Sequence, residues 1–96
     1  MKLEGLVSQD GKTVVTEATG LQIVHFVHTK PDGSKRTGFE VRALPNGEVL
    51  GEYISKRGAE LARDKILGKI KRMGSRAFVL MPEDKEALRL ERECYC

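Results

Sequence analysis

Tryptophan is absent from this 96-residue chain, and its only aromatic side chains are three Phe and two Tyr. No apolar run approaches the roughly 20 residues that a membrane-spanning helix requires, and the opening MKLEGL lacks the apolar stretch of a signal peptide. Proline is also scarce, with three residues, while 40% of the chain is hydrophobic. We therefore expect a soluble, cytoplasmic protein that forms one compact domain over residues 1–96, with residues 93–96 frayed.

Cysteine occurs only at Cys94 and Cys96, within the last three residues. A bond between them would close a tiny loop and constrain almost none of the unfolded chain. A zinc site needs about four ligands, and no second cysteine pair accompanies these two. We interpret them as reduced thiols and expect no metal and no cofactor.

The usual catalytic patterns are missing as well. No Gly-x-Ser-x-Gly elbow surrounds any serine, and no glycine-rich loop is followed by Gly-Lys-Ser/Thr. His25 and His28 are three residues apart on a predicted strand, so they point to opposite faces and cannot share a metal ion. The sequence therefore predicts a protein that is not an enzyme.

Turn residues divide the first half of the chain into predicted strands. Asp10-Gly11, the loop at 31–33 (PDG) and the loop at 45–47 (PNG) separate segments rich in β-branched side chains. The predicted strands are 3–8, 12–17, 21–29, 37–44 and 48–54, arranged as a mainly antiparallel meander.

Two of these strands have informative side-chain patterns. Phe39, Val41 and Ala43 alternate with Glu40 and Arg42, which predicts one face on the core and one in water. The segment 21–27 carries apolar residues on both faces, which predicts a strand buried on both sides.

From Ser55 the apolar spacing becomes helical. Ala59, Ala62, Ile66 and Ile70 recur every three or four residues, with Ser55 as a predicted N-cap. Gly74 is the predicted stop, so the long helix covers about 56–73. A short strand over 77–81 and a second helix from Pro82 complete an α+β fold, in which five or six strands pack on the long helix.

The positive charge is concentrated in one segment. Residues 55–76 hold eight Lys and Arg against two Asp and Glu, whereas residues 1–54 hold six against seven and residues 77–96 three against five. A segment with this excess favours an anionic partner, although a solvated helix face would need none.

A family resemblance lies in the same region. Residues 39–52 (FEVRALPNGEVLGE), followed by 55–62 (SKRGAELA), resemble the second half of a double-stranded RNA-binding domain of the ribonuclease III type. In that family, two such strands lead to a helix that begins Ser-Lys-Lys and grips phosphates, and Lys56 and Arg57 would take those roles. With 21–29 as the first strand, the resemblance covers about residues 21–70. The family's first helix and the motif of its first loop are absent, and Lys35 and Arg36 stand in that loop instead.

These observations predict a small nucleic-acid-binding protein that contacts the phosphate backbone, with duplex RNA as the form that the resemblance implies. The predicted binding residues are Lys56, Arg57, Arg63, Lys69 and Arg72, with Lys35 and Arg36 as auxiliaries. The alternative is a protein-interaction module, for example a phage or mobile-element inhibitor of a larger acidic protein. A homodimer through an exposed sheet edge is compatible with either function.

Overall fold

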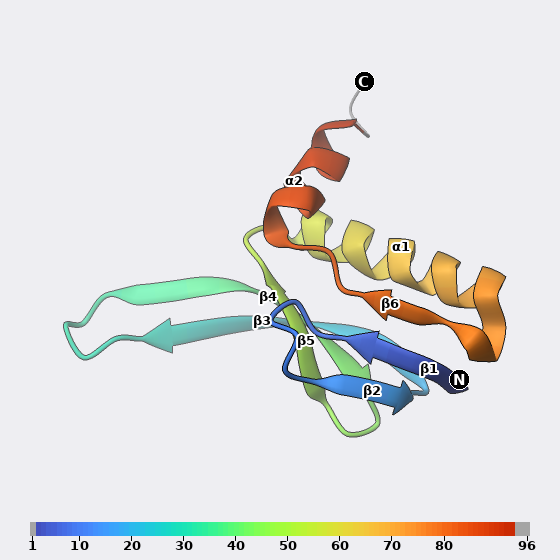
Figure 1. Ribbon diagram of the computed structural model, residues 1–96. Coiled ribbons are helices and arrows are strands. Elements are labelled where there is room, and N and C mark those ends of the chain that lie inside the picture. The colour runs from blue at the N-terminus through green and yellow to red at the C-terminus, as the bar shows by residue number, and fades with distance from the viewer. Residues whose placement is uncertain (1, 94–96) are drawn as a thin grey trace.

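The structure is a computed structural model that describes residues 2–93 (Figure 1). Its elements follow the order β1 (Lys2–Val7), β2 (Val14–Glu17), β3 (Gly20–Thr29), β4 (Lys35–Leu44), β5 (Glu48–Tyr53), α1 (Lys56–Met73), β6 (Phe78–Leu80) and α2 (Asp84–Glu93), with one 3₁₀ turn, Gly74–Arg76, after α1. The predicted α+β fold is confirmed, and so are the long helix and the short C-terminal helix.

The strands do not continue through one meander but divide between two three-stranded sheets. One sheet has the order β2-β1-β6, with β1 antiparallel to β2 and parallel to β6. The other has the order β3-β4-β5 and is antiparallel throughout. Gly11, Gly33 and Gly47 each have a positive φ in the turns that the sequence indicates.

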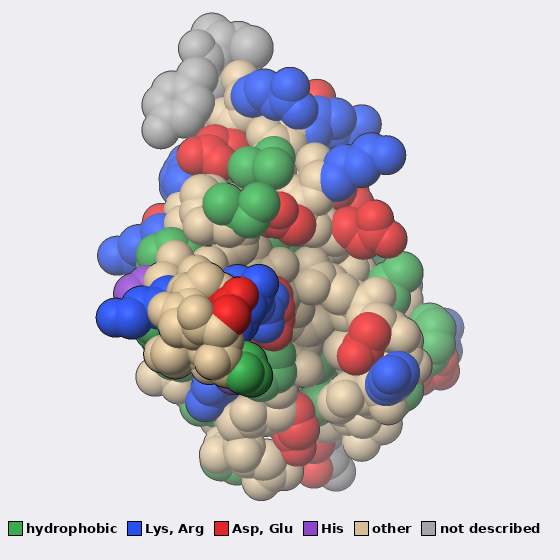
Figure 2. Space-filling model, turned by 90° about the vertical axis from the view of Figure 1, so that its left-hand side faces the viewer, with side chains coloured by type: hydrophobic (Ala, Val, Ile, Leu, Met, Phe, Trp, Pro, Cys, Tyr) green, Lys and Arg blue, Asp and Glu red, His purple; other side chains and the backbone are tan. Residues whose placement is uncertain are grey.

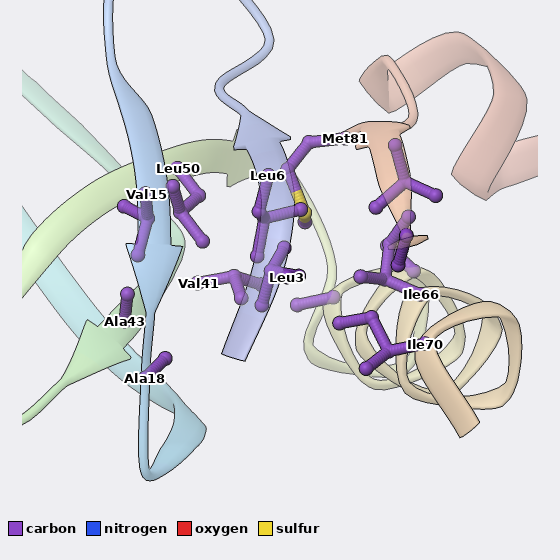
Figure 3. Close-up of a cluster of buried hydrophobic side chains, with 14 of the residues drawn as sticks. Leu3, Leu6, Val15, Ala18, Val41, Ala43, Leu50, Ile66, Ile70 and Met81 are labelled. Atoms are coloured by element: carbon purple, nitrogen blue, oxygen red, sulfur yellow. The ribbon is translucent and has the colours of Figure 1, made fainter. Parts of the chain in front are cut away.

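The helix α1 has the ends that its sequence predicts. The Ser55 side chain accepts a hydrogen bond from the Gly58 backbone N–H, and the Gly74 N–H donates to the Ile70 carbonyl. Its apolar stripe of Ala59, Ala62, Ile66 and Ile70 is buried between the helix and the sheets. Figure 3 shows Leu3 and Leu6 of β1, Val41 and Ala43 of β4, and Ile66 and Ile70 of α1 converging on this core.

The hairpin of β3 and β4 extends well beyond this core. Its ten cross-strand pairs run from Gly20–Leu44 to Thr29–Lys35, and the outer part projects from the body of the molecule (Figure 1). We call residues 26–37 the arm. All residues from 27 to 37 are exposed, and the molecule measures 45 Å along its longest axis.

Two predictions about these strands are wrong. No residue of 21–27 is buried, because β3 is the edge strand of its sheet and its outer half belongs to the projecting hairpin. Glu40, predicted to face water, is only 6% exposed. Its carboxylate accepts a hydrogen bond from Arg42 at 2.6 Å, and this pairing compensates its burial between Val24 and Glu52 on the neighbouring strands.

Candidate nucleic-acid interface

Most of the basic side chains on and after α1 have no ionic partner within the described chain. Of the eight Lys and Arg residues in 55–76, ion pairs form only at Arg63, with Asp64 at 3.1 Å, and at Lys65, with Glu86. The other six lack an ion pair with any of residues 2–93: Lys56, Arg57, Lys69, Lys71, Arg72 and Arg76. The segment therefore presents an excess of positive charge that the protein itself leaves largely uncompensated.

The helical repeat distributes these charges over more than one side of α1. Lys56 and Arg63 are seven residues apart, two turns along the helix, and both line a groove beside β3. Lys65, Lys69 and Arg72 follow the spacing of four and three, so they share the border where Lys65 meets Glu86 of α2. From Lys56 to Arg72 the helix rises by about 24 Å. The predicted helix residues therefore form a long curved band rather than one compact patch.

The helix α2 opposes part of this charge. Its Glu86 carboxylate accepts a hydrogen bond from Lys65, and this bond holds the pKa of Glu86 below its ordinary value. At the N-terminus of α1, the Ser55 hydroxyl donates to Glu91 at 2.9 Å, and Ala87 packs beside Gly58. The acidic side of α2 thus covers one border of α1 and leaves the border with Lys56 and Arg63 open.

The open border forms one wall of a groove of about 560 Å³. Lys56, Glu60 and Arg63 line it from α1, and Ile23, His25 and Phe39 are among the residues that line it from the sheet. The His25 and Phe39 rings lie 5.1 Å apart between centroids, so the floor of the groove is partly aromatic. Sequence reasoning missed His25 and Phe39 as lining residues, because only the packing of α1 over β4 brings them opposite Lys56.

The two auxiliary residues of the predicted site do not lie together. Neighbouring residues of a strand point to opposite faces, so Lys35 and Arg36 face opposite sides of the arm. The Arg36 guanidinium lies 2.8 Å from the Glu52 carboxylate and 5.2 Å from the centre of the Phe26 ring. Lys35 has no such contact, and Lys30, which was not predicted, is exposed at the same tip.

The remaining candidate ligands are dispersed. His25 and His28 lie on opposite faces of β3, where His28 contacts the Phe26 ring and His25 contacts Phe39. Cys94 and Cys96 lie outside the described residues. Within 2–93, no three His, Cys, Asp or Glu side chains form a group that would hold a metal ion.

A second exposed surface is apolar. On the outer face of the β2-β1-β6 sheet, Phe78 is 62% exposed, Leu80 59% and Val14 55%. A Cβ atom on Gly5 would lie 2.9 Å from two carbons of the Phe78 ring, so the ring covers the glycine closely. Exposed apolar groups that gather in this way are typical of interaction surfaces.

Comparison with protein-family models finds no match for this chain, and no solved structure gives a significant match. The resemblance to the double-stranded RNA-binding domain over residues 21–70 therefore stays a prediction. None of the helices described is long and apolar enough to cross a membrane.

Proposed function

We propose that the protein is a small, non-enzymatic nucleic-acid-binding protein that contacts the phosphate backbone through the basic segment 55–76. One observation carries this proposal: six of the eight basic side chains in the segment have no ion pair within the described chain. A nucleic acid would supply the missing negative charges, and each phosphate contact would release condensed counterions.

The N-terminal end of α1 is the strongest part of this surface. Its first turn contains no acidic residue, although the helix dipole stabilises acidic side chains at that end. Lys56 and Arg57 are exposed in that turn instead, next to the backbone N–H groups that a phosphate favours. Lys56 matches the Ser-Lys-Lys start of the family that the sequence resembles, and Arg57 stands at its second Lys; that resemblance supports the proposal without establishing it.

The groove beside β3 extends the same surface. Lys56 and Arg63 stand on its α1 wall, and His25 and Phe39 offer rings on the opposite side. A phosphate on the helix and a base or sugar against the rings would fit the chemistry of this lining. Such contacts would occur in the cytoplasm, the compartment that the sequence predicts and that stays a prediction here.

A fluorescence-polarisation titration tests the proposal with duplex RNA, duplex DNA and single strands at about 50 mM and about 200 mM salt. The variant Lys56→Glu with Arg57→Glu is expected to abolish binding. The domain should stay folded, because the helix dipole stabilises acidic residues in the first turn. The matched control is Lys12→Glu with Lys85→Glu, which makes the same change in net charge at two exposed lysines elsewhere.

The expected result is salt-sensitive binding that the control variant retains and the α1 variant loses. Undiminished binding by a folded α1 variant would show that this end of the helix is not the site. If the wild-type protein binds none of these nucleic acids at low salt, the proposed function is wrong.

A second candidate function rests on the apolar outer face of the β2-β1-β6 sheet. Phe78, Leu80 and Val14 present apolar area there, which suits a protein partner or a second copy of the chain better than a nucleic acid. Binding through this face would resist salt and heparin, whereas binding through α1 would not. Phe78→Ser would weaken binding through the apolar sheet face and leave binding through α1 unchanged. Sizing by light scattering would detect a dimer of the chain.

A further inference from the structure

The arm is a two-stranded ribbon that carries its own positive charge away from the core. All residues from 27 to 37 are exposed, and they include Lys30, Lys35 and Arg36 against the single acid Asp32. Figure 2 looks at this projecting end and shows Lys, Arg and His side chains gathered around it. A hairpin exposed on both faces buries little apolar area, so its length does little for the stability of the fold.

We propose that the arm enters the major groove of B-form duplex DNA, and that the protein therefore prefers duplex DNA to duplex RNA. This inference rests on the proposed function, because α1 would hold the flanking phosphates. It changes the expected form of nucleic acid from the duplex RNA that the sequence resemblance implies.

The dimensions of the arm support this assignment. Paired strands lie about 4.8 Å apart, so a ribbon with its side chains fits a major groove about 12 Å wide. Five residues of β3 and the turn, from Phe26 to Lys30, extend about 16 Å, which exceeds the groove depth of about 8.5 Å. The major groove of A-form RNA is deep and narrow and does not admit such an element.

The base of the arm is braced, which keeps the ribbon in one direction. A Cβ atom on Gly38 would lie 2.9 Å from the Phe26 ring, so the ring covers this glycine closely. The Arg36 guanidinium also lies over the Phe26 ring and binds Glu52 of β5. Arg36 therefore serves the brace, and the charges free to meet phosphates are those of Lys30 and Lys35 at the tip.

The charge at the tip of the arm can be changed without changing its turn. The Asp32 carboxylate accepts hydrogen bonds from the Ser34 backbone N–H at 2.9 Å and from its hydroxyl at 2.6 Å, and these bonds lower the pKa of Asp32. Asn at position 32 can accept the same two bonds without the charge. Asp32→Asn therefore changes the charge of the tip while the turn is kept.

The experiment compares duplex DNA with duplex RNA of the same sequence and length, using wild-type protein and two arm variants. Lys30→Glu with Lys35→Glu is expected to weaken DNA binding at least tenfold, with little effect on the weaker RNA binding. Loss of two phosphate contacts makes the negative slope of log K against log salt shallower by about 1.8. Asp32→Asn is expected to tighten DNA binding, and the Lys12→Glu with Lys85→Glu protein controls for net charge.

The outcomes separate this inference from the proposed function. A DNA preference that the Lys30 and Lys35 variant loses supports the arm as the groove-binding element. Equal binding of DNA and RNA, a preference for RNA, or an arm variant that binds like the control overturns the inference and leaves the function of α1 intact. If the wild-type protein binds neither duplex, this inference fails, and the proposed function fails with it only if single strands are not bound either.

Discussion

Replacing Tyr53 by phenylalanine removes one hydroxyl group from the largest fully buried side chain of the described core. Tyr53 is 2% exposed, and its hydroxyl donates to the Pro82 carbonyl at 2.6 Å. This bond joins β5 to the segment that leads into α2. Burial raises the pKa of Tyr53 above its ordinary value, and the negative charges of Asp84 and Glu86 add to the rise, while Gln9 opposes part of it.

The expected effect depends on pH in a definite direction. Near pH 8 the variant loses this buried hydrogen bond, which costs about 1.5 kcal/mol even though the Pro82 carbonyl still accepts a bond from the Gln9 side chain at 2.8 Å. Above pH 10 the phenol ionises in the unfolded chain but not in the folded core, so the wild-type protein loses about 1.4 kcal/mol per pH unit. The variant has no phenol at this position and escapes that loss. The two stabilities should therefore become equal near pH 11.

Urea unfolding of both proteins at several pH values between 8 and about 11.5 measures this difference. Tyr95 is present in both proteins, so its titration cancels in the comparison. In a separate thermal melt at pH 8, the midpoint of the variant should lie about 6–12 °C below that of the wild-type protein, as expected for a domain of this size. A difference in stability that stays constant up to pH 11.5 would refute the argument that the Tyr53 phenol is kept un-ionised by burial.

Three further predictions concern α1 and its contacts. Gly68→Ala should raise the unfolding free energy by up to about 1 kcal/mol, because a Cβ there meets no atom within 4 Å and alanine favours the helix. Gly58→Ala should stabilise the protein less than Gly68→Ala does, or destabilise it, because its Cβ would lie 2.9 Å from the capping Ser55 hydroxyl. Thermal melts of both variants measure this difference. Glu86→Gln should cost less than about 1 kcal/mol at pH 7. Because the Lys65 bond lowers the pKa of Glu86, that difference should shrink in urea titrations as the pH falls through the ordinary pKa of a glutamate and vanish at lower pH.

Much of the fold is encoded locally, and those parts could be predicted. Ser55 and Gly74 mark the two ends of α1 through their own capping chemistry, and Gly11, Gly33 and Gly47 mark three turns. The division into two sheets has no local cause. It depends on the parallel pairing of β1 with β6, two segments that lie at opposite ends of the chain.

The candidate site could be predicted only as a list of charges. The composition of 55–76 identifies the excess of Lys and Arg, but the sequence cannot tell which of them the acids of α2 neutralise. Lys35 and Arg36 illustrate the difficulty, because adjacent residues of a strand face opposite sides. Only the structure shows that Arg36 contacts Phe26 and Glu52 on the neighbouring strands, whereas Lys35 makes no such contact.

The topology also determines the order in which the chain can assemble. The hairpins of β3, β4 and β5 pair residues close in sequence, so they can form while the rest of the chain is still being synthesised. The strand β1 can complete its pairing only after β6 has been synthesised, because Gly5 pairs with Phe78. Shortening the chain past β6 would leave β1 without its parallel neighbour, whereas an inserted peptide tag between Asp32 and Gly33 would leave the pairing of both sheets intact. A tag in the turn of the arm is therefore expected to spare the fold, and it would also block the proposed entry of the arm into the major groove.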